Sequence, residues 1–157
     1  MTTIHSTSKY LLGKNSKITK EDCKQICLSD LKVGDRILCR NGATSVLDIS
    51  KEWVEELVFV SALDIEPILC SEDYRVCTYA SIPAAKDLEI GNHLLDIDFS
   101  PHMVDEVKTY EYMDEAYKIT LFQNHLFYIN GVLLGNENID IIEEEEEESI
   151  IYCFCGE

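Results

Sequence analysis

Seven cysteines carry the most versatile chemistry in this chain, because thiols can bind zinc, form disulfides or act as nucleophiles. They are Cys23, Cys27, Cys39, Cys70, Cys77, Cys153 and Cys155. No two of them have the Cys-x-x-Cys spacing that is typical of zinc sites. The odd count, without a recognisable signal peptide, favours reduced thiols in a cytoplasmic setting. We therefore interpret the cysteines as small buried apolar residues, with a zinc site as the alternative.

A run of six glutamates at residues 143–148 is the second feature that could bind a cation. Adjacent like charges repel one another, so we interpret this run as a solvated acidic linker without a fixed metal ion. The formal net charge is −17, from 30 acidic and 13 basic residues. Such a field repels phosphates and anionic lipids. We expect no nucleic-acid partner, no membrane partner and no cofactor.

Short segments rich in β-branched and aromatic residues must position any site in this chain. Several alternate polar with apolar residues, which indicates half-buried strands. The predicted strands are residues 36–39, 45–49, 56–60, 75–79, 104–112, 116–120 and 125–129. Turns are predicted at Gly34, Asn41-Gly42, Gly91 and Asn130-Gly131. Residues 20–31 and 83–88 are candidates for short helical turns. The sequence therefore predicts an all-β domain.

The chain also repeats itself. Residues 30–38, DLKVGDRIL, match residues 87–95, DLEIGNHLL, at a shift of 57. Ile49 then falls near Val107, and residues 55–60 parallel residues 114–119, so the shift drifts by only two residues. Asp-Leu-x-x-Gly is also a common turn before a strand, which is the simpler explanation. The agreement of three successive blocks favours two related halves and a pseudo-twofold β structure.

These features, together with the closing block, resemble the Hint (hedgehog/intein) family of self-processing domains. The opening residues 18–37 are similar to the family's first strand, hairpin and Gly-Asp turn. Residues 116–136, AYKITLFQNHLFYINGVLLGN, are similar to its closing strand, His, Gly turn and terminal Asn. The resemblance implies a Hint-like pseudo-twofold domain of two interlocked subdomains at residues 16–137. A flexible N-terminal arm, residues 1–15, precedes it in this interpretation. An acidic linker and a short β-prone segment follow at residues 138–157.

The resemblance also implies four chemical parts. A Cys or Ser at the first position attacks the preceding carbonyl, and a His within a Thr-x-x-His pattern assists that step. A His before a terminal Asn helps the Asn cyclise, and a Cys, Ser or Thr after it accepts the chain. In this sequence the first nucleophile falls at residues 10–12, where there is no Cys or Ser. Ser6 and Ser8 are close, but each requires a shifted alignment.

The other three parts are also changed. Alignment of the Thr-x-x-His pattern with residues 70–73 puts Asp73 at the His position, and an ionised carboxylate is a poor proton donor. Gly135 replaces the penultimate His, and Glu137 follows the Asn. Asn136 and His125 remain as the family's terminal Asn and helper His. Both also have structural explanations, Asn136 as a turn residue and His125 as a half-buried residue of a strand.

The resulting functional prediction is a non-catalytic Hint-like structural or protein-interaction module. We expect a protein partner and consider a viral or phage assembly as its setting, with a cytoplasmic or virion-associated location. Residual self-cleavage at Asn136 is the alternative, and a plain β-barrel binding module is a third. The oligomeric state stays open. The β-prone residues 150–155 are expected to pair with the sheet of this domain or of a partner.

Overall fold

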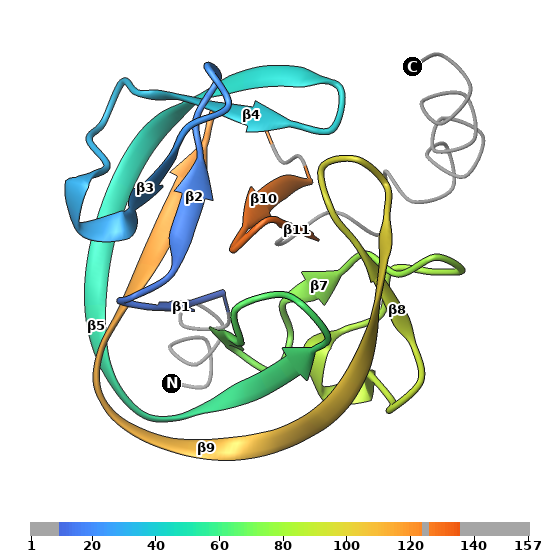
Figure 1. Ribbon diagram of the computed structural model, residues 1–157. Helices are drawn as coiled ribbons and strands as arrows, with labels where there is room; N and C mark the ends of the chain where they lie inside the picture. The colour runs from blue at the N-terminus through green and yellow to red at the C-terminus, as the bar shows by residue number, and fades with distance from the viewer. Residues whose placement is uncertain (1–9, 124–125, 136–157) are drawn as a thin grey trace.

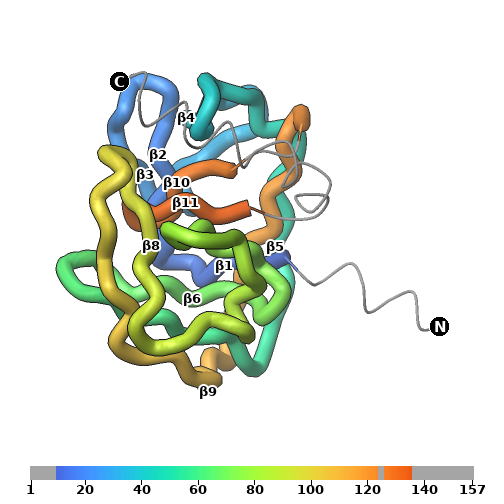
Figure 2. Tube along the Cα trace, turned by 90° about the vertical axis from the view of Figure 1, so that its right-hand side faces the viewer, coloured from blue at the N-terminus to red at the C-terminus, as the bar shows by residue number. Residues whose placement is uncertain are grey.

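The computed structural model describes residues 10–123 and 126–135, and this part of the chain is folded almost entirely from β-strands (Figures 1 and 2). The strands are β1 (Leu12–Gly13), β2 (Lys17–Thr19), β3 (Gln25–Cys27), β4 (Arg36–Cys39), β5 (Gly42–Ala62), β6 (Ile68–Cys70), β7 (Arg75–Val76), β8 (His93–Leu95), β9 (Pro101–Leu121), β10 (Phe127–Ile129) and β11 (Val132–Gly135). Two 3-10 turns, η2 (Leu28–Asp30) and η3 (Ala85–Asp87), are the helical elements in these residues. The predicted all-β class is confirmed.

Two strands of 21 residues each, β5 and β9, form an antiparallel ribbon that curves around the outside of the molecule (Figure 1). Their pairing runs from Val46↔Leu121 to Ala62↔Val104, with irregular register at three places. Such irregularities bend a ribbon and increase its twist, which allows strands of this length to wrap around a small core. The predicted strands at 45–49 and 56–60 are therefore one strand, and so are those at 104–112 and 116–120.

The two halves of the chain have the same local structure where the sequence repeats. Each begins with a 3-10 turn, η2 or η3, followed by a glycine with positive φ, 96° at Gly34 and 101° at Gly91. Each glycine N–H donates to a valine of the long strand, and that valine N–H donates back to the residue after the glycine. These bonds are Gly34–Val46 (2.8 Å) and Val46–Asp35 (2.9 Å) in the first half, and Gly91–Val104 (2.9 Å) and Val104–Asn92 (2.8 Å) in the second.

The pairing of β5 with β9 interlocks these halves. The beginning of β5 pairs with the end of β9 in the first half, and the end of β5 pairs with the beginning of β9 in the second. Phe122 N–H correspondingly donates to Ser45 O, and Leu63 N–H donates to Met103 O. Each long strand thus passes from one half into the other, which is the predicted pseudo-twofold architecture of two interlocked subdomains.

The core lies inside this ribbon and is centred on the closing hairpin. Phe127, Ile129, Val132 and Leu134 of β10 and β11 are buried together with Tyr74. Cys39, Cys70 and Cys77 are buried apolar residues, as predicted. Cys27 is partly buried. Cys23 is exposed, because it lies at the tip of the β2–β3 hairpin with a φ of 72°.

The predicted turns hold with one correction. Asn130 and Gly131 have φ of 51° and 86° between paired Ile129 and Val132, as a two-residue hairpin requires. In the β4–β5 hairpin Cys39 pairs with Gly42, so the turn residues are 40 and 41. Asn41-Gly42 is therefore not the central pair of that turn, and of the two only Gly42 has a positive φ.

Three further predictions need correction. Residues 20–27 are not helical, because Ile26 pairs with Ile18 and forms a β2–β3 hairpin; only η2 follows the prediction for 20–31. The predicted strand at 75–79 is limited to β7. Residues 10–15 do not belong to a flexible arm, since β1 pairs with β6 and β9 and the side chains of Leu11 and Leu12 are buried. No helix in the described residues is long and apolar enough to cross a membrane.

Candidate functional site

The N-terminal end of the described domain is held by a short segment that follows β6. Leu11 N–H donates to Ser71 Oγ at 2.7 Å, and Ser71 N–H donates to Leu11 O at 2.9 Å. The Ser71 hydroxyl in turn donates to Leu11 O at 3.3 Å. Ser71 is buried, so these bonds are shielded from water. The serine thereby fixes the backbone at the position where the resemblance expects the first nucleophile.

Tyr74 completes this contact three residues later. Its side chain is fully buried, and its ring lies edge-on to Tyr10 with centroids 5.8 Å apart and edge-on to Phe127 at 6.4 Å. The Tyr74 hydroxyl has no hydrogen-bond partner among the described residues. Burial, with Cys70 and Tyr10 beside it, raises the pKa of this phenol far above its usual value, so it stays neutral.

The C-terminal end of the described domain reaches the same segment. Leu134 pairs with Val76, and Gly135 pairs with Arg75, the residue after Tyr74. Residues 71–75 therefore contact Leu11 on one side and β11 on the other. Leu11 and Gly135, which are more than 120 residues apart in sequence, are thereby brought to one short segment. We call residues 71–75, with Tyr10, Leu11 and Gly135, the junction site.

Of the three site residues predicted from the sequence, only Asp73 lies among the described residues. The Asp73 carboxylate forms an ion pair with Lys86 Nζ at 3.3 Å, and this bond raises the pKa of Lys86. The contacts to Tyr10 and Leu11 come from Ser71 and Tyr74 instead, which sequence analysis did not select. The sequence signal that could have indicated them is the pattern Ser-x-x-Tyr, a hydroxyl residue followed three positions later by an aromatic residue. This pattern begins at Ser71, one position after Cys70, where the Thr-x-x-His pattern was aligned. His125 and Asn136 lie outside the described residues.

The hydroxyl and thiol groups at and beside the junction site favour neutral, unreactive states. Burial raises the pKa of the Cys70 thiol to about 12, so little nucleophilic thiolate forms at neutral pH. The Ser71 hydroxyl is committed to the Leu11 backbone. The described residues contain no group of three or more His, Cys, Asp or Glu side chains that could hold a metal ion.

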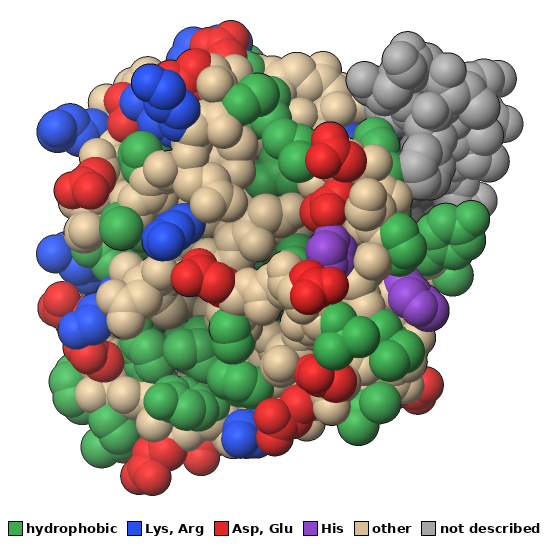
Figure 3. Space-filling view, in the orientation of Figure 1, with side chains coloured by type: hydrophobic (Ala, Val, Ile, Leu, Met, Phe, Trp, Pro, Cys, Tyr) green, Lys and Arg blue, Asp and Glu red, His purple; other side chains and the backbone are tan. Residues whose placement is uncertain are grey.

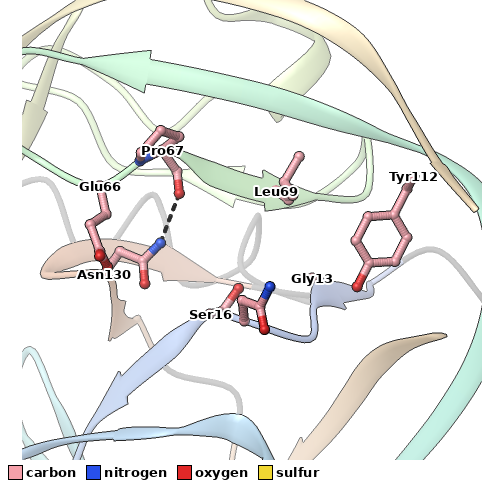
Figure 4. Close-up of a pocket in the computed structure, with 8 residues that line it drawn as sticks. Gly13, Ser16, Glu66, Pro67, Leu69, Tyr112 and Asn130 are labelled. Carbon is pink, nitrogen blue, oxygen red and sulfur yellow. Dashed lines mark hydrogen bonds between the residues drawn. The ribbon is translucent and has the colours of Figure 1, made fainter. Parts of the chain in front are cut away.

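A separate cavity of about 190 Å³ is lined by Gly13 of β1, by Glu66 and Pro67 of the loop before β6, and by Asn130 of the β10–β11 turn (Figure 4). The Asn130 amide spans it, with Oδ1 accepting from Lys17 N–H at 2.9 Å and Nδ2 donating to Pro67 O at 2.9 Å. Tyr112 Oη accepts from Lys14 N–H at 2.8 Å and donates to Glu115 O at 2.7 Å. These bonds tie backbone segments together, so we interpret the cavity as structural.

The surface shows how the charge is distributed. On the face shown in Figure 3, basic side chains gather on the left, over β2, β3 and β5. Acidic side chains lie over much of the same face, including its lower and right-hand parts. Several basic groups are paired with acids, among them Lys14 with Asp114 at 2.7 Å and Arg36 with Glu21 at 3.2 Å.

Solved structures similar to this chain identify the fold. The gp41-1 intein is 22% identical, with a TM-score of 0.69 over 81% of this chain and 98% of that one. The bacterial intein-like domain from Clostridium thermocellum is 20% identical, with a TM-score of 0.69 over 81% and 97%. A DnaB intein from Synechocystis sp. PCC 6803 is 14% identical, with a TM-score of 0.71 over 82% and 99%.

The chain has the Hint fold of inteins. The match covers nearly the whole length of each of these three structures, so the similarity concerns the complete Hint domain. No protein-family model matches the sequence, and no curated protein matches it. The Hint fold predicted from the repeat and the closing block is therefore confirmed by structure, at sequence identities of 14% to 22%.

Proposed function

We propose that this chain is a Hint domain that has lost peptide-bond processing and serves as a structural or protein-interaction module. The proposal is supported by the junction site, because the Hint resemblance expects the first nucleophile at residues 10–12 and Tyr10 and Leu11 lie there without a Cys or Ser. Leu11 has no nucleophilic group, and the Tyr10 hydroxyl, at the far end of its ring, cannot reach the preceding carbonyl as the side chain of a Cys or Ser does. Leu11 is buried, and its backbone is bonded to Ser71.

The acid–base partners support the same proposal. We infer that Tyr74, in contact with Tyr10, stands where the family has the His of its Thr-x-x-His pattern, and that Ser71 stands for the Thr. A neutral phenol whose pKa is raised by burial is a poor substitute for an imidazole, which exchanges protons near neutral pH. In this proposal the hydrogen bonds that fix the backbone are retained, and the side chains that would catalyse peptide-bond cleavage are lost.

What remains is a scaffold that holds Leu11 and Gly135, near the two ends of the described domain, on one segment. We propose that the domain presents the chains attached to these ends to a protein partner, in an assembly such as that of a virus or phage. The rigid attachment of Leu11 to Ser71 and of Gly135 to Arg75 supports this role, because it fixes both exit points. The expectation that nucleic acid and membranes are not partners belongs to the same proposal.

A reporter fusion tests the loss of N-terminal processing. A folded reporter is placed ahead of residue 10, and the fusion is incubated with excess dithiothreitol at neutral pH. Thiols release an upstream chain only after it has moved onto a Cys or Ser side chain, so we expect no free reporter. Ser6→Ala/Ser8→Ala is the matched control. Release from the parent fusion, abolished in this variant, would establish an active nucleophile and refute the proposal.

Cleavage after Asn136 is the second candidate, and one observation favours it. Gly135, the last described residue, pairs with Arg75 next to Tyr74, so the chain leaves β11 at the junction site. Cyclisation of an Asn side chain needs mainly correct positioning, which can lower such a barrier by several kcal/mol. Gly135 in place of the usual His removes acid assistance, typically worth about 10²–10⁴ in rate. We therefore expect cleavage, if any, to take weeks.

A further inference from the structure

The loop between β8 and β9 is organised by one carboxylate and one imidazole that lie outside the junction site. Asp96 Oδ1 accepts from Asp98 N–H at 2.8 Å and from Ser100 N–H at 2.9 Å. Its other oxygen, Oδ2, lies 2.7 Å from His102 Nε2. One carboxylate therefore shapes the loop with one oxygen and binds a strand residue with the other.

The second nitrogen of the imidazole binds a different element. His102 Nδ1 lies 2.9 Å from the carbonyl oxygen of Leu63, the first residue after β5. Leu63 N–H donates to Met103 O at 3.0 Å, so both backbone groups of Leu63 are held by neighbouring residues of β9. The imidazole thus joins the β8–β9 loop to the start of the loop between β5 and β6.

Both partners of this imidazole are oxygen atoms that act as acceptors, since a carbonyl oxygen and an ionised carboxylate have no proton to donate. Both contacts can be hydrogen bonds at the same time only when each ring nitrogen carries a hydrogen, and only the imidazolium cation has two N–H groups. Asp64, in the loop after β5, is a second negative charge that favours the cation. The His102 side chain is only 15% exposed, so water competes weakly for these bonds.

We propose that His102 is a protonation-dependent latch between the β8–β9 loop and the start of the β5–β6 loop. When the ring is a cation it holds both Asp96 and the Leu63 carbonyl. When it loses one proton to solvent, a bare nitrogen faces one of the two acceptors, and that contact opens.

Nuclear magnetic resonance of the full chain, with ¹⁵N-labelled histidines, tests the latch. The ring nitrogens of His102 should stay doubly protonated above pH 6.5, the usual pKa of histidine. The Asp96→Asn variant should bring the His102 transition to lower pH. Titration of His102 at or below its usual pKa, or no response to Asp96→Asn, would overturn the proposal.

Amide hydrogen exchange tests the mechanical part. After correction for intrinsic rates, the Leu63 and Phe99 amides should exchange roughly fivefold faster above the His102 transition than below it, the effect of losing about one hydrogen bond. His102→Gln should remove this pH dependence, and the matched control His93→Gln should keep it. Exchange rates that do not follow the His102 transition would show that the Asp96–His102 ion pair forms without controlling the contact between the two loops. This result would also overturn the proposal.

Discussion

The hairpins that open the two halves, β4–β5 and β8–β9, begin alike and end differently. Both follow a 3-10 turn and a glycine with positive φ, and both pair with a valine near the start of a long strand. The first closes with a two-residue turn between Cys39 and Gly42. The second closes with residues 97–99 between Asp96 and Ser100, with Phe99 at a φ of 62°, as in three-residue hairpin loops.

One extra residue in the second hairpin is thus accompanied by a new polar site. The longer loop needs partners for its backbone N–H groups, and Asp96 supplies them. Its remaining oxygen then binds His102, whose equivalent in the first half, at a shift of 58, is the buried Thr44. The shared part of the repeat preserves the fold, while the inserted residue allows a difference in chemistry.

The largest expected effect tests whether the two halves are energetically equivalent. Val46 and Val104 are both fully buried and hold the same position in their halves. Val46→Ala and Val104→Ala should each lower the free energy of unfolding by roughly 2–3 kcal/mol, from lost apolar burial and the cavity left behind. Urea denaturation measures both. A difference of more than about 1.5 kcal/mol between the two variants would break the equivalence.

Alanine substitutions at Gly34 and Gly91 compare the backbone conformation of the two halves. At Gly34 and Gly91 no heavy atom lies within 4 Å of the place that a Cβ would take, so an added methyl group meets no neighbour and the effect is conformational. Alanine at φ of 96° or 101° should cost about 1–2 kcal/mol at each site. Thermal unfolding of Gly34→Ala and Gly91→Ala checks this. Stabilisation by either substitution would contradict the turn geometry.

At the junction site we predict a substitution that raises the free energy of unfolding, whereas the preceding substitutions lower it. Tyr74→Phe removes a buried hydroxyl without a partner among the described residues, and keeps the ring contacts to Tyr10 and Phe127. We expect the variant to be more stable by up to about 1 kcal/mol, because desolvation of the hydroxyl is avoided. Denaturant titration measures the change. A loss of more than about 1 kcal/mol would show that the hydroxyl has a bonding role.

The pH dependence of stability should differ between the halves, because only the second contains the Asp96–His102 pair. Hydrogen bonding to Asp96 raises the pKa of His102 above its usual 6.5, although burial opposes the shift. Burial would raise the pKa of Asp96, but the bonds from His102, Ser100 and Asp98 outweigh it, and the pKa lies below 3.8.

The directions of these two pKa shifts define the pH range in which the pair stabilises the protein. The His102 contribution is fully present below pH 6.5 and is lost as the pH rises through its raised folded pKa; the Asp96 contribution is present above pH 3.8 and is lost as the pH falls. His102→Gln should therefore destabilise the protein most between about pH 4 and 6.5, by about 1 kcal/mol, and less at pH 9. Thermal unfolding across this range measures it. An effect that grows with pH would contradict the assignment.

The smallest expected effect concerns Asp73. Its ion pair with Lys86 lies at the surface, and such pairs are screened by solvent. Asp73→Asn should leave the unfolding midpoint unchanged within error and should not create any processing activity. Lys86→Met is the matched control for the pair. A clear drop in melting temperature in Asp73→Asn alone would show that Asp73 has a further role at the junction site.

Features that depend on neighbouring residues were predicted from the sequence, and features that depend on contacts between distant residues were not. The turns at Gly34 and Gly91 and the Asn130-Gly131 hairpin were predicted, because positive φ restricts those positions to a few residue types. The fusion of strands into β5 and β9 was not. In the middle of β5, residues 50–56 are mostly exposed on both sides, so the polar–apolar alternation that marks a strand is missing there.

The candidate site was predicted only in part for the same reason. Leu11 and Ser71 are 60 residues apart, and no local pattern indicates that Ser71 rather than Cys70 begins the contact. The arm predicted for residues 1–15 failed for residues 10–15 because polar neighbours concealed two buried leucines. The Asp96–His102 pair was not predicted, because neither residue lies in the repeated turns or in the closing block that resemble the Hint family.

Intact-mass spectrometry of the purified full chain tests the central claim most directly. The protein is kept for several days at neutral pH, with and without dithiothreitol, beside an Asn136→Ala variant. We predict a single species with the mass of residues 1–157 in every sample. Separation of residues 1–136 from residues 137–157 in the parent protein, but not in Asn136→Ala, would contradict this and would show a working self-cleaving domain.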